Sequence, residues 1–488
     1  MKNPIKLFLI FCFFSSFISI ASGQQTETFY QTYDYGFAEK AYAVAATSDG
    51  GYIMTGFQGV GFGTNRIPII KTDSLGNEEW HKIYGHPIRN NARAIIPLDD
   101  GGYMVGANTS GEEFTGEFDD IYLLRLDENG DTLWTKTLVE DGLEYLFDMK
   151  QCPDGGYIIA GGRVTPGQSA SDGYALKIDN MGNKEWEQSY SEGNDFDIFW
   201  NVEVLPDSTY VFSGETEMEP EVQRQGWLLR INKNGDLNWS KHYGWIHTEL
   251  TRGGLVIDED HIVVAGGTTS FSGNVQYDAL IAKFDMQGDT IWTRVIDGGL
   301  SEYNIRGITK SISGNYLLAI NDYDEEDETE YDIVVSEVTP NNEILWTNTV
   351  IAGEKSEFAW DILQSTDGSI IVCGETASNC NKCAFLIKLT EDGYLSNSKN
   401  IDSSLPYNIS IYPNPASEFL NIDFPDFLKN KILTINIYNN TGQLIKSREY
   451  HELNTLKLDL SAFPSGSYFL VLRNKENNII AKRSIIKY

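Results

Sequence analysis

The segment LDENGDTLW at residues 126–134 returns as FDMQGDTIW at residues 284–292, with acid, glycine, acid and tryptophan in the same places. The tryptophan belongs to a series that recurs about every 53 residues along the chain. Its members are Trp80, Trp134, Trp186, Trp239, Trp292 and Trp346. Regular spacing of this length is typical of proteins built from repeated structural units.

Each repeat contains four short segments with the composition of β-strands. In one copy these are ARAIIP (92–97), GGYMVGA (101–107), YLLRLD (122–127) and the tryptophan segment, and glycine-rich turns separate them. Four short strands per repeat predict the blade of a β-propeller. A seventh copy at residues 368–393 stops before its tryptophan segment.

The missing strand has a counterpart at the other end of the chain. The segment TFYQTYDYG (28–36) resembles the tryptophan segments, with Phe29 or Tyr30 in the tryptophan's place. A ring closed in this way leaves no unpaired strand edges. We therefore expect an all-β chain in which residues 25–400 form a seven-bladed β-propeller closed by the N-terminal strand, followed by a smaller C-terminal β-domain.

The Asp-x-x-Gly turn of each repeat has the chemistry of a tight hairpin. Its glycine can adopt positive φ, and its acids can accept hydrogen bonds from their own backbone. The pattern is similar to the tryptophan-docking repeats of quinoprotein propellers, so we expect the tryptophans to pack between adjacent blades. We predict no cofactor. Calcium bound by these turns or by the acidic segment 322–332 is the alternative, although the spacing is not that of an EF-hand loop.

The first residues have the features of a secretory signal peptide. Lys2 and Lys6 precede an apolar run at residues 7–20, and the small residues Ala21 and Gly23 precede the expected cleavage site. The run is too short for a membrane span, and no later segment approaches the roughly 18 apolar residues that a span needs. We expect residues 1–23 to be removed and the protein to be exported.

The composition changes after a polar linker near residue 400. Alternating apolar residues and turn signals predict a small β-sandwich over residues 406–488. Within it stand a YPNP motif, a turn that ends in glycine, an SGSYFL segment and a basic end. Their marker residues are Tyr412, Pro413, Asn414, Pro415, Gly442, Gly466, Tyr468, Lys482 and Lys487.

In this order, the motifs resemble the type A C-terminal sorting domain of type IX secretion substrates. The resemblance implies that the type IX secretion machinery is a partner and that the protein is secreted or displayed on the outer cell surface. In that family the domain is commonly removed at the surface.

Charge and cysteine content exclude other classes. The formal charge of −33 argues against nucleic acid as a partner. Three cysteines lie close together, and in an oxidising compartment we expect a local disulfide among Cys373, Cys380 and Cys383, with Cys152 free. A zinc site at CNKC lacks a second cysteine pair.

Long, diverse connections between the second and third strands of each repeat indicate which face carries function. About ten residues after each tryptophan, a mostly acidic position recurs where the innermost strand is expected to begin. It is occupied by Glu39, Asn90, Glu144, Asp197, Glu249, Glu302 and Glu357. We expect these side chains at the mouth of the central channel, either accepting backbone hydrogen bonds from a neighbouring blade or collecting a cation or basic ligand.

Aromatic residues and arginines follow these positions at short range. They are Tyr42, Arg93, Phe147, Trp200, Arg252, Arg306 and Trp360. Such residues suit the stacking of sugars and the recognition of carboxylates. Packing between blades is the alternative.

Three classes of function fit these features. We favour an exported binding module for a polysaccharide or a surface protein. The alternatives are an enzyme that degrades an extracellular polysaccharide, with carboxylates at the channel mouth as acid and base, and a structural surface component. The sequence contains no nucleophile elbow, metal-ligand cluster or cofactor fingerprint.

Overall fold

The computed structural model describes residues 27–395 and 410–487 with short gaps. The gaps are residues 62–63, 87–88, 111–119, 140, 169, 193–195, 219–222, 245–247, 271–276, 297–301, 324–330, 352–355, 378–379, 381, 413–418, 424–432, 440–443, 451–454, 465 and 474–478. The described residues form strands and turns, without a helix among them. The signal peptide expected at 1–23 lies outside this part of the chain.

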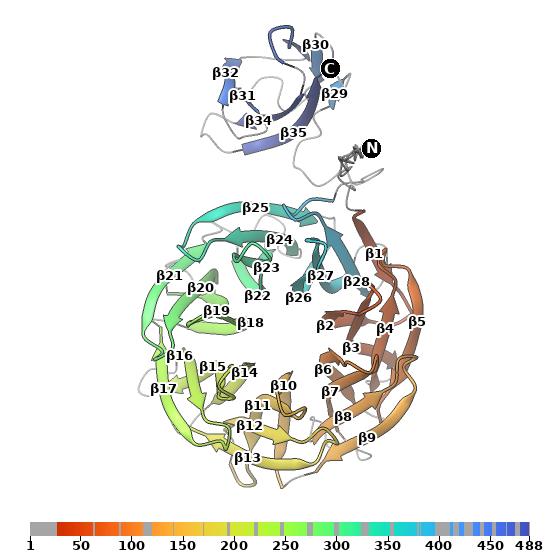
Figure 1. The fold of residues 1–488 in the computed structure, drawn as a ribbon, viewed down its shortest axis with the longest axis vertical. Coiled ribbons are helices and arrows are strands. Elements are labelled where there is room, and N and C mark those ends of the chain that lie inside the picture. The colour runs from red at the N-terminus through yellow and green to blue at the C-terminus, as the bar shows by residue number, and fades with distance from the viewer. Residues whose placement is uncertain are drawn as a thin grey trace, which may run out of the picture.

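Residues 29–389 form seven four-stranded antiparallel sheets, arranged radially as in a β-propeller (Figure 1). Sheet 1 contains β2 (Glu39–Ala46), β3 (Tyr52–Gly61), β4 (Thr64–Thr72) and β5 (Glu78–Tyr84). Sheet 2 contains β6 (Asn90–Pro97), β7 (Tyr103–Thr109), β8 (Asp120–Leu126) and β9 (Thr132–Leu138). Sheet 3 contains β10 (Leu143–Gln151), β11 (Tyr157–Val164), β12 (Asp172–Ile178) and β13 (Lys184–Tyr190).

The next three sheets repeat this order, with the first strand innermost and the fourth on the rim (Figure 1). Sheet 4 contains β14 (Asp197–Val204), β15 (Tyr210–Met218), β16 (Gln223–Ile231) and β17 (Leu237–Tyr243). Sheet 5 contains β18 (Glu249–Asp258), β19 (His261–Thr268), β20 (Asp278–Asp285) and β21 (Thr290–Ile296). Sheet 6 contains β22 (Glu302–Lys310), β23 (Tyr316–Tyr323), β24 (Tyr331–Val338) and β25 (Ile344–Ile351).

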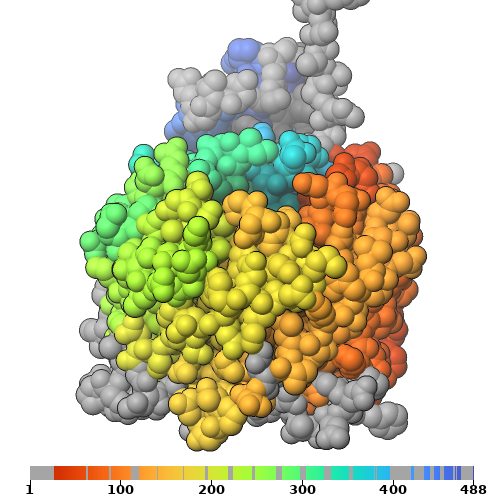
Figure 2. Space-filling model, turned by 60° about the horizontal axis from the view of Figure 1, so that its bottom comes forward, coloured from red at the N-terminus to blue at the C-terminus, as the bar shows by residue number. Residues whose placement is uncertain are grey.

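Sheet 7 combines strands from both ends of this region. It contains β26 (Glu357–Gln364), β27 (Ile370–Thr376) and β28 (Cys383–Leu389), and its fourth strand is β1 (Phe29–Tyr33). β1 runs antiparallel to β28, with Phe29 opposite Lys388 and Tyr33 opposite Ala384. In the space-filling view, the colours of successive sheets abut along the side of the ring that faces the viewer (Figure 2).

An aromatic ring on each outer strand rests on the turn glycine of the next sheet. Gly130 has φ of +76°, and a Cβ built there would lie 2.7 Å from the ring of Trp80. The other pairs of this kind are Phe29 with Gly76, Trp134 with Gly182, Trp186 with Gly235, Trp239 with Gly288 and Trp346 with Gly393. Phe29 therefore fills the tryptophan's place at the first strand.

Sheet 6 departs from this rule at the turn that Trp292 covers. Asn342 stands there with φ of +72°, a conformation that asparagine tolerates better than most residues. The indole Nε1 of Trp292 donates a hydrogen bond to the carbonyl of Pro340, over 3.1 Å. Trp186 and Trp239 make the equivalent hydrogen bond at turns that keep their glycine, so the polar contact is preserved although the glycine is not.

The acids of these turns bond their own backbone. The Oδ1 atom of Asp127 accepts hydrogen bonds from the amides of Asn129 (2.9 Å) and Asp131 (2.7 Å). Asp73, Asp179 and Asp285 accept equivalent pairs in their own turns. The turn motif therefore acts as scaffold, because its carboxylates are occupied by hairpin amides.

A buried cation on the third strand bonds the aspartate of the turn before the second strand. Lys71 lies 2.7 Å from Asp49, and the same pairing recurs in five further sheets. These pairs are Arg125 with Asp100, Lys177 with Asp154, Arg230 with Asp207, Lys283 with Asp258 and Lys388 with Asp367. In sheet 6 the polarity is reversed, since Glu337 faces Ser311, Ser313 and Asn315.

Two further sheets follow in the C-terminal region. One contains β29 (Ser410–Tyr412), β30 (Phe419–Asp423) and β33 (Thr455–Asp459). The other contains β32 (Leu444–Tyr450), β31 (Leu433–Asn439), β34 (Gly466–Arg473) and β35 (Ile479–Lys487), in that order. Both contribute to one apolar core, made by residues such as Leu420 and Leu458 from the first and Ile437 and Leu470 from the second.

The cysteines follow the sequence expectation. Cys380 and Cys383 form a disulfide, which confirms the predicted local bond and identifies its two partners. Cys152 and Cys373 are free thiols and both are buried. Burial raises the pKa of the Cys152 thiol to about 11, so it is poorly reactive at neutral pH.

The docking contact predicts a difference between two glycines of similar backbone conformation. Gly130→Ala should lower the free energy of unfolding by about 2–4 kcal/mol, because it adds strain at positive φ and a clash with Trp80. Gly155→Ala is the matched control, since Gly155 has φ of +83° and nothing within 4 Å of its Cβ position. Urea unfolding should show a loss of only about 1 kcal/mol for this control. Equal losses would show that the tryptophan contact contributes nothing.

The cation–aspartate pairs predict a loss of stability in acid. Burial alone would raise the pKa of Asp258, but hydrogen bonds from Lys310, Tyr316 and Lys283 hold it at about 2. The unfolded value is about 3.9, so this stabilisation is complete above that pH and is lost as pH falls through 2. Asp258→Asn should therefore remove up to about 2 kcal/mol of the change in unfolding free energy between pH 5 and 2. Parallel curves for the variant and the wild type would contradict the assignment.

Candidate functional site

Each innermost strand carries a β-bulge near its middle. In β10 the pairing passes from Leu146 to Asp148, so that Phe147 has no partner on β11. The register shifts in the same way at Tyr42, Arg93, Trp200, Arg306 and Trp360, and across residues 251–253 of β18, where Arg252 is the central residue. A bulged residue is released from the alternation of the strand, which redirects its side chain.

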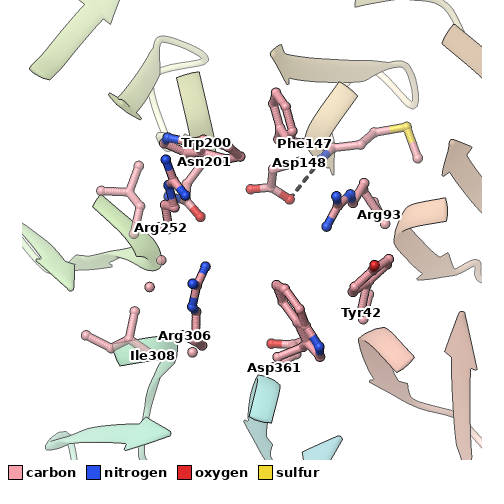
Figure 3. A pocket seen from close by; sticks show the side chains of 18 of the residues that line it. Tyr42, Arg93, Phe147, Asp148, Trp200, Asn201, Arg252, Arg306, Ile308 and Asp361 are labelled. Carbon is pink, nitrogen blue, oxygen red and sulfur yellow. Dashed lines mark hydrogen bonds between the residues drawn. The ribbon is translucent and has the colours of Figure 1, made fainter. Parts of the chain in front are cut away.

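The seven bulge residues line one cavity of about 460 Å³ at the centre of the ring. We call this space the channel cavity, and we call its seven bulge side chains the channel ring: Tyr42, Arg93, Phe147, Trp200, Arg252, Arg306 and Trp360. Figure 3 shows labelled members of the ring pointing inward from their separate strands. The ring consists of four aromatic side chains and three arginines.

Successive members of the channel ring touch one another. The guanidinium of Arg93 lies 4.2 Å from the centre of the Tyr42 ring and 5.9 Å from that of Phe147. Phe147 and Trp200 are 4.2 Å apart between ring centres, and Arg252 lies 4.6 Å above Trp200. These contacts form a continuous wall of cation–π and aromatic pairs over five sheets.

The remaining side of the ring is built in the same way. Arg306 lies 5.3 Å from the Trp360 ring and 5.2 Å from Phe358, and Trp360 meets Tyr42 edge-on at 4.8 Å. Arg252 and Arg306 are neighbours of like charge. Burial lowers the pKa of Arg306 to about 10, and the charge of Arg252 adds to this effect.

The three arginines differ in their polar partners. Arg252 makes two contacts with the buried carboxylate of Glu215, at 3.1 and 3.4 Å. The Nε atoms of Arg93 and Arg306 are buried and have no hydrogen-bond partner among the described residues. The indole Nε1 atoms of Trp200 and Trp360 are also buried and have no hydrogen-bond partner among the described residues. The cavity therefore presents several donors that lack acceptors.

The residue after the bulge often ties one sheet to the next. Asp148 accepts a hydrogen bond from the amide of Val202 (3.1 Å), and Asp361 accepts one from Val44 (3.0 Å). The side-chain amide of Asn201 donates a hydrogen bond to the carbonyl of Thr251 in sheet 5, over 2.9 Å. Burial raises the pKa of Asp361 to about 6. These polar groups in the channel wall thus bond backbone groups of the neighbouring sheet.

The acidic positions predicted at the channel mouth lie elsewhere. Six of them are at most 1% exposed, and they line neither the channel cavity nor a second cavity beside it. They are Glu39, Asn90, Glu144, Asp197, Glu249 and Glu357. Glu302 begins β22, but its side chain lies outside the described part of the structure. For these six positions the expectation of a place at the channel mouth is not met, because a paired residue directs its side chain to a face of its sheet, and those faces are covered by neighbouring sheets.

Their hydrogen bonds show what these side chains do instead. Asp197 accepts hydrogen bonds from the Glu192 amide and the Ser191 hydroxyl, both at 3.0 Å, in the segment arriving from the preceding sheet. Glu249 and Glu357 accept from threonines opposite them on the second strand. Burial raises the pKa of Asp197. The interpretation of these residues as acceptors that hold the connection between sheets fits this geometry.

A second cavity of about 620 Å³ lies beside the first, against sheets 3 and 4. We call it the side cavity. It shares Phe147, Trp200 and Arg252 with the channel cavity. Arg224 also lines it, with its guanidinium 4.3 Å from the centre of the Phe196 ring and 3.1 Å from Glu217. The sequence did not predict this cavity, because residues from six different strands meet there without a shared motif.

Metal ligation has little support among the described residues. Asp34, Glu39 and Cys383 place possible ligand atoms within 4.8 Å of one another. The sulfur of Cys383 is bonded to Cys380, and Glu39 accepts hydrogen bonds from Phe37 and Gln58. Most of the acidic segment 322–332 lies outside the described residues.

Residues 410–487 match the family described as secretion system C-terminal sorting domain. The C-terminal region is therefore a type IX sorting domain, recognised by the type IX secretion machinery, and the protein is secreted or displayed at the cell surface. Tyr412 lies in β29, Gly466 and Tyr468 in β34, and Lys482 and Lys487 in β35. The predicted marker residues Pro413, Asn414, Pro415 and Gly442 lie outside the described residues.

Solved structures resemble the chain in fold. The WD40 β-propeller domain of Doa1 is 14% identical, with 73% of this chain and 96% of that chain covered and a TM-score of 0.43. The β-propeller domain of the Trilobed protease from Pyrococcus furiosus is 10% identical, with coverages of 72% and 94% and a TM-score of 0.43. A protein of unknown function from Bacteroides caccae is 11% identical, with coverages of 61% and 92% and a TM-score of 0.40. These similarities concern the fold alone.

No curated protein matches the sequence. Among the residues that the structure describes, no helix has the length and apolar character needed to cross a membrane.

The two sets of residues predict losses of stability of different size. Glu249→Ala should lower the free energy of unfolding by about 1–3 kcal/mol, because the hydroxyls of Thr268 and Ser270 lose their acceptor. Arg306→Ala removes a buried cation that has no carboxylate partner, so its cost should stay below about 1 kcal/mol. Urea unfolding of the ligand-free protein measures both. A larger loss for Arg306→Ala than for Glu249→Ala would show that the arginine is a structural element.

Proposed function

We propose that this protein is an exported binding module that holds a polysaccharide at the channel ring. In this proposal the seven sheets are the blades of a seven-bladed propeller closed by β1, and the two C-terminal sheets form the β-sandwich that directs export. The observation that carries the proposal is the convergence of seven bulge side chains, all aromatic or arginine, on one cavity.

The chemistry of the ring favours sugar over other ligands. Aromatic faces bind the apolar faces of sugar rings, and guanidinium groups donate to hydroxyl or carboxylate oxygens in a fixed geometry. Phe147 and Trp200 lie between the channel cavity and the side cavity, which gives a chain of several sugar units room to continue. The volume of about 460 Å³ falls within the range of small-ligand sites.

The enzymatic alternative required carboxylates at the channel mouth, and the structure gives them little support. The five acids at these positions whose side chains the structure describes, Glu39, Glu144, Asp197, Glu249 and Glu357, are buried and line neither cavity. Asp148 and Asp361 do line the channel, but their oxygens accept hydrogen bonds from backbone amides. Binding without catalysis therefore fits the site better, and a surface protein as ligand remains an outcome for the test.

The test is a binding assay with the full secreted protein and a panel of neutral and acidic polysaccharides. We expect retention of at least one polysaccharide in affinity electrophoresis, without new reducing ends. Trp200→Ala should weaken that retention about fivefold or more, by analogy with the about 1–3 kcal/mol that stacking of one nucleobase on an aromatic ring contributes. Phe37→Ala is the control, because Phe37 is 46% exposed and lines neither cavity.

Other outcomes assign a different function. New reducing ends that disappear in the Trp200→Ala variant would make the protein an enzyme. No retention of any polysaccharide, together with capture of a surface protein that depends on Trp200, would replace the polysaccharide by a protein ligand.

A further inference from the structure

We propose that the polysaccharide is acidic and that one of its carboxylate or sulfate groups lies between Arg93 and Arg306 in the channel cavity. The inference rests on the proposed function and adds the chemical class of the ligand. It begins from the two guanidinium groups of the channel ring that have no acceptor.

Half-buried arginines elsewhere in the ring of sheets have a hydrogen-bond or ion-pair partner, which is a carboxylate for Arg163 and Arg230 and Asn342 for Arg294. Arg163 lies 3.0 Å from Glu144, and Arg230 lies 2.8 Å from Asp207. Arg252, which belongs to the channel ring, forms an ion pair with Glu215. Against this background, Arg93 and Arg306 differ, because neither guanidinium has an ion-pair or hydrogen-bond partner among the described residues and the Nε atom of each is buried.

A half-buried cation with an unpaired buried Nε atom is costly, so its retention needs a reason. Leaving a buried donor without an acceptor costs about 1–3 kcal/mol, and a charged group costs more. Burial lowers the pKa of both guanidinium groups, and the charges of Arg252 and Arg93 further disfavour the charged form of Arg306. An anion in the cavity would remove this repulsion and supply the missing acceptors.

The acids of the channel wall do not take this role. Asp148 and Asp361 accept hydrogen bonds from the amides of Met149, Val202, Val44 and Ile362. Lys150 lies 3.0 Å from Glu203 and 3.8 Å from Asp148. The charged groups of Asp148, Asp361 and Lys150 are therefore bonded to one another or to backbone amides, whereas Arg93 and Arg306 have no such partner.

Two indole donors extend the recognition beyond a single anion. The Nε1 atoms of Trp200 and Trp360 are buried without a partner, and each indole lies against an arginine of the ring. A sugar that carries the acidic group could accept from these donors through its ring or hydroxyl oxygens. The neighbouring side cavity, reached at Phe147 and Trp200, would take the next sugar unit.

The overall charge of the protein makes the interaction specific. At −33 the chain repels polyanions at long range, so simple ionic adsorption does not account for binding of an acidic polymer. Binding of such a polymer must then come from the local arrangement of arginines and aromatic rings.

The test uses the full secreted protein and isothermal titration calorimetry with two matched pairs of probes. These are oligogalacturonate, its fully methyl-esterified form, and a sulfated dextran oligomer beside unsulfated dextran. We expect at least one acidic probe to bind ten or more times more tightly than its neutral counterpart. The member of the panel that binds distinguishes a carboxylate from a sulfate ligand.

Substitutions connect this preference to the two arginines. Arg93→Gln and Arg306→Gln should each weaken the acidic probe at least tenfold and leave the neutral probe unchanged. Arg306→Lys keeps the charge but loses the guanidinium geometry, so an intermediate loss is expected. Arg448→Gln, on the exposed β32, changes the net charge equally and should have no effect.

The outcomes separate this inference from the proposed function. Equal affinity for acidic and neutral probes would overturn the inference and leave polysaccharide binding intact. Wild-type affinity for the acidic probe in Arg93→Gln and Arg306→Gln would also overturn it. If no polysaccharide binds but inorganic sulfate raises the unfolding temperature in an Arg93-dependent way, the anion site stands and the polysaccharide function fails.

Discussion

The contact between an outer aromatic ring and the turn glycine of the next sheet joins each sheet to its neighbour. The ring of Trp80 lies so close to Gly130 that a side chain at that position would collide with it. This one contact explains why the tryptophan and the Asp-x-x-Gly turn recur together, since each is the partner of the other in the adjacent repeat. Phe29 makes the same contact with Gly76, so the sheet that contains both ends of the ring is joined to the first sheet by the same interaction.

The regular stacking of sheets restricts what can reach the channel. Side chains of paired residues project toward the two faces of their sheet, and in a ring of packed sheets both faces are covered. A bulge is the simplest departure from this rule, and every innermost strand has one or, in β18, a longer irregular stretch. The channel ring is therefore a set of positions that the packing of the sheets leaves free to vary.

Sequence periodicity predicted most of the fold for a physical reason. Tryptophans such as Trp134, turn glycines such as Gly130 and the apolar runs between them are each fixed by the same contact in every repeat. The match of β1 to the missing strand followed from the same pattern. The sorting domain was recognised from local motifs, which do not depend on the arrangement of the sheets.

The candidate site was predicted only in part, because two periodic positions looked alike. Glu144 and Phe147 recur at the same interval and lie three residues apart, and sequence alone placed both at the channel. A bulge adds one residue to the alternation of the strand, so it decides which of the two faces the channel. No residue type signals the bulge here. Contacts across sheets, such as that between Asp361 and Val44, are likewise set by three-dimensional packing.

Most cations inside the ring of sheets have a carboxylate partner, and the unpaired channel arginines stand out against this pattern. Acids outnumber cations so strongly in this chain that a buried cation could readily have found a carboxylate. The third-strand lysines and arginines have done so in six sheets, whereas in sheet 6 Glu337 accepts hydrogen bonds from neutral side chains. The charges on the third strands thus have partners from within the fold. Arg93 and Arg306 depart from that pattern at the one place where seven strands converge, so the acceptor they lack is best sought in a ligand rather than in the fold.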